Sequence, residues 1–310
     1  MKKKILILGG AGFLGSNLCC YLRNQGYGVC CFDVEYPAQR QKGIHYIKGD
    51  FFNDGELEDA VSDKDCIIHA ISTVNPGNSN ELYMRGYGKD LLQTIRLCEM
   101  LAEKKIKMIF ISSGGTVYGN HVKQPIDENV LPSPINHYGN IKLSIENAMR
   151  TFNIQMNTKF LIARVSNPYG QGQDFHKGVG FVDAVLKNTL EGNPVEIWGD
   201  GENVRDYVYI SDVCEMMGCM VEYQGEEDTF NICSGTGVSQ NEVIRIIRRM
   251  GLNPDVIYMK KRSVDVRKII LSNKKISSIW KKGPINLEEG IGIYRRYLEE
   301  RVYGDRRNDT

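Results

Sequence analysis

Short apolar runs alternate with helical stretches through the first half of this 310-residue chain. The runs are continuous and rich in β-branched residues, which is typical of strands buried on both faces of a parallel sheet. They occupy residues 4–10, 27–34, 43–50, 66–72, 107–113 and 158–167, and the helical stretches occupy 16–24, 54–62, 82–104 and 137–152. This order predicts a doubly wound α/β fold, in which helices cover both faces of the sheet.

The second half is looser and predicts a smaller α/β unit. Segments 167–173 and 198–203 are rich in Gly, Asn and Asp and read as loops. Helices are expected at 181–191 and 241–251, and 205–213 reads as a strand that leads into a helix. No linker separates the halves, so we expect domains at 1–168 and 169–310 that pack together, with segment 205–235 folding back onto the first.

The composition excludes several classes of protein. Lys plus Arg is 39 and Asp plus Glu is 38, which is too balanced for a chain built to bind nucleic acid. The nine cysteines are odd in number, lie mostly in apolar runs and include no CxxC pair. We expect thiols in a reducing compartment and no metal site. The apolar run after Met1 is too short for a signal peptide or a membrane span, which predicts a cytoplasmic protein without membrane contact.

A glycine-rich turn joins the first strand to the first helix. Gly9, Gly12 and Gly15 have the spacing G-x-x-G-x-x-G. A phosphate at a helix N-terminus meets unpaired N–H groups, and glycines leave room for it to approach. Asp33 closes the second strand 18 residues after Gly15. Its carboxylate suits ribose hydroxyls and repels a 2′-phosphate, which favours NAD over NADP. The alternative is a plain glycine turn followed by a capping Asp.

Asp50 and Phe51 end the third strand at the same edge of the sheet. An acid with an apolar neighbour could hold the adenine of a dinucleotide there. The alternative is that Asp50 caps the following helix.

Tyr138 and Lys142 are four residues apart on a predicted helix and therefore share a face. An ammonium near a phenol lowers its pKa, so Tyr138 could act as a general base near neutral pH. The pair is common by itself and could lie on a solvated helix face. However, Ser112 and Ser113 end the fifth strand, and ligands of this fold bind at the carboxyl ends of strands. We therefore expect both segments to meet in one crevice.

Six segments in this order carry a family resemblance: GGAGFLG (9–15), Asp33, SSGGTVYG (112–119), HYGNIK (137–142), RVSNPYG (164–170) and GDGENVRDYVYISD (199–212). Together they resemble the extended short-chain dehydrogenase/reductase family of NAD-dependent nucleotide-sugar epimerases and dehydratases. The resemblance spans nearly the whole chain. The segments at 112–119 and 166–173 look most like the UDP-glucose and UDP-N-acetylglucosamine 4-epimerases.

This resemblance implies an NAD-binding Rossmann domain at 1–168, a nucleotide-sugar domain at 169–310 and a role for each matching residue. The pyrophosphate of NAD would lie against Gly9, Gly12, Phe13, Leu14 and Gly15. The adenosine would lie against Asp33, Asp50 and Phe51. The nicotinamide half would lie against Ala70, Ile71, Ser72, Ser112, Tyr138 and Lys142. The sugar nucleotide would be held by Asn167, its diphosphate by Arg205 and Arg262, and its ribose by Asp265. The alternative to diphosphate binding is that Arg205 forms a salt bridge with Asp206. For Arg262, the alternative is that it is simply part of a general basic run.

The chain departs from the family pattern beside the catalytic tyrosine. Gly114 stands where relatives usually carry a Ser or Thr that hydrogen-bonds the sugar 4-oxygen, so Thr116, or Ser113 through a water, would replace it. Dehydratases have an Asp-Glu pair where this chain has Gly115 and Thr116, which argues against 4,6-dehydration. Arg85 stands where relatives often have an Asn near the cofactor.

The sequence therefore predicts a nucleotide-sugar 4-epimerase that acts on a UDP-sugar with tightly held NAD. The rivals are a 4-keto-sugar reductase or dehydratase of the same family and a non-catalytic dinucleotide sensor. Ile269 falls where relatives control the room for an N-acetyl group, so UDP-GlcNAc could fit as well as UDP-glucose. Relatives usually form homodimers through helices placed here at 89–104 and 137–152.

Overall fold

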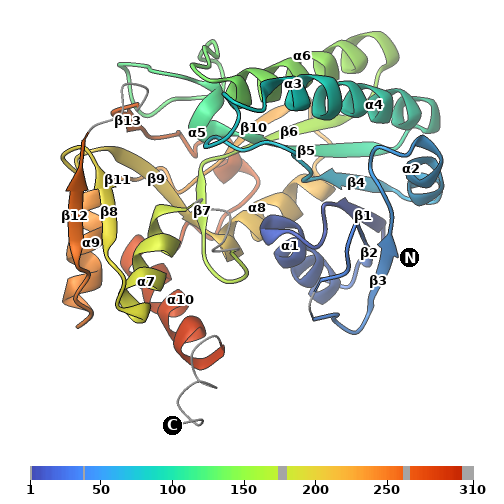
Figure 1. The fold of residues 1–310 in the computed structure, drawn as a ribbon. Coiled ribbons are helices and arrows are strands. Elements are labelled where there is room, and N and C mark those ends of the chain that lie inside the picture. Colours follow the sequence, from blue (N-terminus) through green and yellow to red (C-terminus); the bar gives the residue numbers. More distant parts are fainter. Residues whose placement is uncertain (1, 38, 174–179, 261–265, 302–310) are drawn as a thin grey trace.

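A computed structural model describes residues 2–37, 39–173, 180–260 and 266–301. At its centre is a seven-stranded sheet with the order β10-β6-β5-β4-β1-β2-β3, in which all neighbours are parallel (Figure 1). The strands are β1 (Lys4–Leu8), β2 (Gly28–Asp33), β3 (Ile44–Lys48), β4 (Cys66–His69), β5 (Lys107–Ser113), β6 (Phe160–Val165) and β10 (Thr229–Ile232). The predicted doubly wound α/β fold is confirmed.

Both faces of the sheet are buried beneath helices. Along β1, Ile5 and Ile7 pack with α1 (Phe13–Asn24) and α8 (Ile210–Glu222), whereas Leu6 and Leu8 pack with the other layer. That layer comprises α2 (Asp54–Val61), α4 (Leu92–Lys104) and α6 (His137–Met156). Because side chains alternate along a strand, every residue of β1 that reaches a helix layer must be apolar, and this produces the continuous KILIL run.

The strand order reverses at β1, which pairs with β2 on one side and β4 on the other. Connections from β1 and β4 leave the sheet toward opposite faces, so a crevice opens at the carboxyl ends of these strands. The glycine turn follows β1, and the loop from Ala70 follows β4. The ligand site is expected at this crevice.

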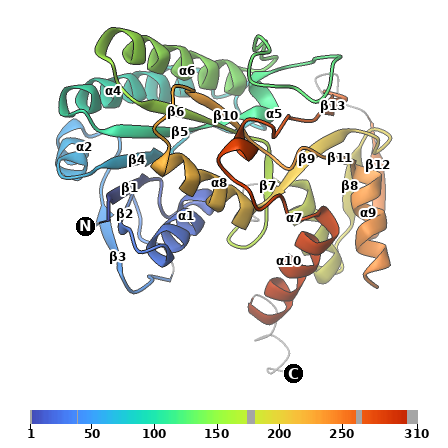
Figure 2. The ribbon, with the colours of Figure 1, turned by 180° about the vertical axis from the view of Figure 1, so that it is seen from behind.

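A second, smaller group of elements lies beside the carboxyl ends of the strands (Figures 1 and 2). Its strands form two sheets: β11-β9-β13 with β7 paired to β9, and β12-β8. Their bounds are β7 (Asn167–Tyr169), β8 (Val195–Trp198), β9 (Val204–Tyr209), β11 (Gly237–Ser239), β12 (Val256–Met259) and β13 (Lys268–Ile269). The helices are α7 (Phe181–Glu191), α9 (Gln240–Arg249), α10 (Leu287–Arg301) and the short η3 (Ile276–Ser278). The chain returns from β9 through α8 to β10, the edge strand of the large sheet.

Two predicted elements differ from the structure. The helix expected at 82–104 is divided into α3 (Tyr83–Arg85), a π-helical segment η1 (Gly86–Leu91) and α4. A π turn preserves the helical direction and the apolar pattern, so periodicity cannot distinguish it from an α-helix. Part of the loop expected at 167–173 is strand β7, which is only three residues long and is fixed by pairing with β9.

The described residues contain no helix long and apolar enough to cross a membrane. They also contain no cluster of His, Cys, Asp and Glu that could hold a metal ion. All nine cysteines are free thiols, most of them buried.

A buried ion pair fixes helix α6 to the sheet. Glu146 is fully buried and accepts hydrogen bonds from Arg164 Nη2 at 2.6 Å and from Ser112 Oγ at 2.6 Å. Arg164 lies on β6 and Ser112 on β5, so one carboxylate joins the helix to two neighbouring strands. Arg164 also stacks on Tyr118, with its Cζ 4.8 Å from the ring centroid.

We expect Glu146→Gln to lower the free energy of unfolding by about 3–5 kcal/mol, because it leaves the Arg164 guanidinium buried without its counter-charge. Replacing both partners by Glu146→Leu and Arg164→Met should recover much of this loss. Lys4→Gln, which breaks an exposed pair with Asp63, should cost less than about 1 kcal/mol and serves as the control. Urea unfolding measures the free energy of unfolding of all three variants. A Glu146→Gln protein as stable as the wild type would contradict the expectation.

Candidate active site

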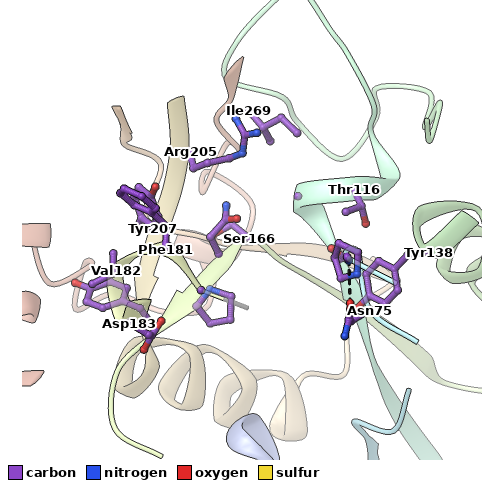
Figure 3. Close-up of a pocket in the computed structure, with 18 of the residues that line it drawn as sticks. Asn75, Thr116, Tyr138, Ser166, Phe181, Val182, Asp183, Arg205, Tyr207 and Ile269 are labelled. Atoms are coloured by element: carbon purple, nitrogen blue, oxygen red, sulfur yellow. Dashed lines mark hydrogen bonds between the residues drawn. The ribbon is translucent and has the colours of Figure 1, made fainter. Parts of the chain in front are cut away.

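A cavity of about 810 Å³ opens at the carboxyl ends of the central strands, between the large sheet and the smaller group of elements. Its walls come from the glycine turn, the loop after β4, α5 (Gly114–Val117), the start of α6, and β7, α7, β8 and β9. Figure 3 shows Thr116 and Tyr138 on one side of this cavity and Phe181, Val182, Asp183 and Tyr207 on the other. Segments far apart in the sequence therefore contribute to one site.

The glycine turn forms a cradle at the N-terminus of α1. The predicted pyrophosphate residues Gly9, Gly12, Phe13, Leu14 and Gly15 all line the cavity. A Cβ on Gly15 would lie 2.1 Å from the carbonyl oxygen of Gly9, so only glycine allows this close turn. The N-cap residue, Gly12, offers no side-chain hydrogen bond to the helix. An anion can therefore reach the N–H groups of the first turn, which suits a pyrophosphate.

Asp33 lies behind this turn, at the end of β2. Its Oδ2 accepts a hydrogen bond from the Ala11 N–H at 3.0 Å and its Oδ1 accepts one from the Val34 N–H at 2.8 Å. The carboxylate thus fixes the turn while each oxygen keeps a further lone pair for a ribose hydroxyl. Asp33 is half-buried and does not itself line the cavity.

The Asp50–Phe51 pair fits its predicted role less well. The Asp50 carboxylate is exposed and accepts a hydrogen bond from the Phe52 N–H at 2.9 Å, while Asn53 caps α2. The Phe51 ring is 2% exposed and packs 4.9 Å from the His69 ring, between centroids. Because this ring belongs to the core, it offers adenine no stacking surface, and only the backbone of Phe51 remains for that role.

The loop after β4 passes along the cavity. Ala70 lines it, and Ile71 packs against Gly9, where a Cβ would lie 3.1 Å from Ile71 Cγ1. Ser72 does not line the cavity, and its single hydroxyl proton is shared between the Val74 carbonyl oxygen at 2.8 Å and Asp90 Oδ2 at 3.0 Å. Its hydroxyl therefore supports the loop from behind.

Tyr138 and Lys142 lie on one face of α6, as predicted. Tyr138 lines the cavity, and Lys142 is 4% exposed with its Nζ 5.6 Å from the Tyr138 ring centroid. The Lys142 ammonium donates a hydrogen bond to the Ile111 carbonyl oxygen at 3.1 Å. Lys142 is thus buried against the sheet and Tyr138 is half-buried at the cavity wall, so the pair does not lie on a solvated helix face.

In the protein alone, the pKa of Tyr138 shifts in the direction opposite to the expected one. Burial, assisted by the charge of Asp90, raises the pKa of Tyr138 to about 12. Burial also lowers the pKa of Lys142 to about 8, although Asp90 and Glu146 act in the opposite direction. Desolvation disfavours both charged forms, so Lys142 alone does not make Tyr138 a phenolate near neutral pH.

The hydroxyls beside Tyr138 have different surroundings. Thr116 Oγ1 is buried, lines the cavity and has no hydrogen-bond partner among the described residues. The Thr116 carbonyl oxygen would be only 2.7 Å from a Cβ on Gly139, so α5 packs directly against the first turn of α6. Ser113 also lines the cavity, whereas the Ser112 hydroxyl is bound to Glu146. Ser112 therefore supports the site through the core.

The structure explains the glycine at position 114. A Cβ there would lie 2.3 Å from Leu271 Cδ1 and 3.0 Å from the Arg164 carbonyl oxygen. A Ser or Thr would collide with both groups. The unsatisfied hydroxyl of Thr116, two residues further along, is the group placed to act instead.

Two of the predicted substrate residues, Arg205 and Asn167, also line the cavity. Asn167 lies beside Gly115 of α5, where a Cβ would be 3.8 Å from Asn167 Oδ1. The Asn167 amide donates to the Asp206 carbonyl oxygen at 3.0 Å. The Asp206 side chain faces the core, where Oδ1 accepts from the Ser234 N–H at 2.9 Å and Oδ2 from the Gly235 N–H at 3.0 Å. Asp206 is thus held by β10 and its following turn rather than by Arg205. Arg262 and Asp265 lie outside the described residues.

Several cavity residues had no sequence signal. Asp183 on α7 is 1% exposed, and burial raises its pKa to about 7. Tyr207 on β9 has a buried hydroxyl with no partner among the described residues. Ile269 also lines the cavity, whereas Arg85 is exposed and does not line it. Both Asp183 and Tyr207 lie in apolar patterns that indicate core positions, and only the folded chain shows that they face a cavity.

Comparisons with known proteins identify the family of this chain. Residues 5–233 match the NAD dependent epimerase/dehydratase family. A UDP-glucose 4-epimerase of Halalkalibacterium halodurans is 28% identical over 97% of both chains. A dTDP-4-dehydro-6-deoxyglucose reductase of Escherichia coli is 32% identical over 79% of this chain and 81% of its own. The crystal structure of UDP-glucose 4-epimerase with UDP-glucose from Thermotoga maritima has a TM-score of 0.90 and 30% identity, covering 96% of this chain and 99% of that one. This chain belongs to the NAD-dependent epimerase/dehydratase family.

Proposed function

We propose that this protein is a nucleotide-sugar 4-epimerase that uses tightly bound NAD and acts on a UDP-sugar. The observation that carries the proposal is that Tyr138, the unsatisfied Thr116 hydroxyl and Arg205 line one cavity, with Lys142 buried behind Tyr138. A general base, a hydroxyl that would orient the sugar and a cation for a diphosphate are thereby available to one bound ligand. The glycine cradle at α1 supplies the place for the cofactor.

Tyr138 would remove the proton from the sugar 4-hydroxyl and later return it. Thr116 Oγ1 would hydrogen-bond the same oxygen and hold it toward Tyr138, while Lys142 would bond the nicotinamide ribose. Bound NAD⁺ would supply the hydride acceptor, the hydride donor for the return step, and a positive charge that favours the phenolate. The burial that raises the pKa of Tyr138 also excludes water from the reacting atoms.

Arg205 would hold the diphosphate while the 4-keto sugar turns over and presents its other face. A guanidinium suits this task because its fork of donors matches phosphate oxygens. Asn167 would contact the sugar nucleotide, and Arg262 and Asp265 would bind the diphosphate and ribose. Net redox change over the cycle is zero, so no reduced cofactor leaves the site.

A 4-keto-sugar reductase is the second candidate, because one relative at 32% identity carries that name. Dehydration is less well supported, since Gly115 and Thr116 provide no acid-base pair. Incubation with UDP-glucose and UDP-GlcNAc side by side separates these activities. An epimerase yields the 4-epimer without accumulating NADH, whereas a reductase needs a 4-keto sugar and consumes NADH in equal amounts. Conversion of neither sugar, together with NADH consumption by a keto sugar, would refute the epimerase.

The cavity end at Ile269 bears on the choice of sugar. Ile269 is 1% exposed and lines the cavity from β13. It is smaller than an aromatic residue, so an N-acetyl group would find room beside it. Relative kcat/KM for the two UDP-sugars tests this point directly.

Tyr138→Phe should reduce turnover at least about 100-fold, because it removes the general base without changing the shape of the site. NAD binding should be retained, and fluorescence titration of the cofactor checks this. Thr116→Val is a matched variant that keeps the volume of the side chain and removes only its hydroxyl, so it should lower kcat by a smaller factor. A Tyr138→Phe protein with near-normal turnover would eliminate this mechanism.

Asp33→Asn should raise the affinity for NADP relative to NAD by about tenfold, because it removes the repulsion of a 2′-phosphate. Asparagine retains a side-chain oxygen for the backbone turn. Asp50→Asn is the control: both cofactors carry the same adenine, so their affinity ratio should stay constant. An unchanged ratio in Asp33→Asn would remove this residue from the ribose site.

We further propose that the chain forms a homodimer through α4 and α6. These helices lie side by side on the outer layer (Figure 1), where Leu92 is 56% exposed and Leu143 is half-buried. Leu92→Glu should convert the dimer to a monomer in sedimentation velocity. Val122→Glu, an equally polar change at an exposed site outside these helices, should leave the dimer intact. A wild-type chain that sediments as a monomer at micromolar concentration would contradict the proposal.

A further inference from the structure

The carboxylate of Asp90 is a buried charge to which neither the family resemblance nor the proposed mechanism gives a role. Asp90 is 5% exposed and lies on the π-helical segment η1. Its Oδ2 accepts hydrogen bonds from the Thr73 N–H at 2.8 Å and from Ser72 Oγ at 3.0 Å. Its Oδ1 has no hydrogen-bond partner among the described residues. A buried carboxylate that is only half satisfied is costly, so its surroundings must compensate for it.

Those surroundings are the helix that carries Tyr138. Segment η1 packs closely on α6, because a Cβ on Gly86 would lie 2.3 Å from Ile141 Cδ1. Beside this contact, the Tyr87 hydroxyl accepts a hydrogen bond from Asn140 Nδ2 at 2.6 Å. Asp90 follows Gly86 by four residues, about one turn of a helix, and therefore lies on a similar side of η1.

The backbone of Asp90 is held by a second set of contacts, which involve Thr94 and His69. Thr94 Oγ1 donates a hydrogen bond to the Asp90 carbonyl oxygen at 2.6 Å and contacts His69 Nε2 at 2.9 Å. His69 does not neutralise Asp90, because burial, with a smaller effect of the Lys142 charge, lowers its pKa to about 3. The imidazole is therefore neutral at physiological pH.

Lys142 is the buried cation that this chain of contacts reaches. Its Nζ lies over the Phe110 ring, whose centroid is 5.4 Å from that of the His69 ring. His69 in turn contacts the Thr94 hydroxyl that is bonded to Asp90. The Lys142 Nζ is buried between the Ile111 carbonyl oxygen at 3.1 Å and the Phe110 ring, whose centroid is 4.6 Å away. The other acid near it, Glu146, is already bound by Arg164. Asp90 thus supplies a negative charge that no cation among the described residues contacts directly. The same charge is the largest influence that opposes the burial-induced fall in the pKa of Lys142.

We propose that Asp90 is a positioning residue whose charge keeps Lys142 an ammonium in the dry core and whose Oδ2 fixes the Ser72–Thr73 turn. It acts on Lys142 through the electric field rather than through contact. The proposal rests on the proposed function for the catalytic meaning of the Lys142 charge, but the charge itself can be measured without turnover.

The direct test is the titration of Lys142 by NMR in protein with ¹³C-labelled lysine, where the Lys142 signal is identified by its loss in Lys142→Arg. In the wild type the pKa of Lys142 should be near 8. Asp90→Asn removes a negative charge that favours the ammonium, so the ammonium should lose its proton at lower pH. We expect at least about a tenfold fall in proton affinity, or about one pH unit. A Lys142 titration that does not move would overturn the proposal.

Three variants separate charge from structure. Glu99→Gln neutralises an exposed acid on α4 and should leave the titration of Lys142 in place. Ser72→Ala removes one hydrogen bond to Asp90 but keeps the charge, so it should also leave that titration in place. Asp90→Thr serves as a second neutral variant if Asp90→Asn does not fold. A shift in Ser72→Ala as large as in Asp90→Asn would show that loop geometry, and not charge, controls Lys142.

The pH profile of turnover connects this charge to catalysis. The groups that face Lys142 are Asp90 from η1, Glu146 and Tyr138 from α6, and the neutral His69 from β4. Loss of the Lys142 proton should produce the alkaline limb of kcat, and Asp90→Asn should move that limb to lower pH. If the limb stays while the NMR titration moves, Lys142 charge does not govern turnover and the positioning role fails. If no sugar is epimerised, the NMR result still decides whether Asp90 controls Lys142.

Discussion

The carboxylate of Glu146 is the interaction on which the candidate site depends most. It lies one helical turn beyond Lys142 and two turns beyond Tyr138, and it ties α6 to the strands that carry Ser112 and Arg164. A charged group buried so completely tolerates little change in geometry, because each lost hydrogen bond leaves a charge exposed to an apolar core. The orientation of the α6 face that carries Tyr138 and Lys142 is therefore fixed by the Glu146 contact further along the same helix.

Much of the fold follows from patterns that are local in sequence. The KILIL strand, the glycine turn and the 181–191 helix are each specified by apolar period and by residues with special backbone requirements. The π-helical segment at Gly86–Leu91 could not be predicted, since its pattern is that of an α-helix. Strand β7 was also missed, because three residues carry no periodicity and only the pairing with β9 defines them.

The candidate site, like the fold, could be predicted from the sequence only in part. Glycines 9, 12 and 15 and the Tyr138–Lys142 spacing were predictable, because their chemistry requires those residue types at those intervals. The buried ring of Phe51, the engaged hydroxyl of Ser112 and the pKa of Tyr138 were not, because burial depends on elements that lie far away in the chain. The sequence also provided no reason to select Asp90, Asp183 or Tyr207. A sequence pattern can indicate that a position is buried, but it cannot show what surrounds the buried side chain.

Neighbouring residues Arg205 and Asp206 point to opposite sides of β9, one to the cavity and one to the core. Asp206 is held there by Ser234, Gly235 and the Leu271 N–H. A slip of one residue in the pairing of β9 would exchange them, burying the guanidinium and turning the acid toward an incoming diphosphate. The strand can therefore present a binding surface in only one register. In the proposed function, ligand binding through Arg205 would therefore require that β9 has paired with β7 and β11 in this register.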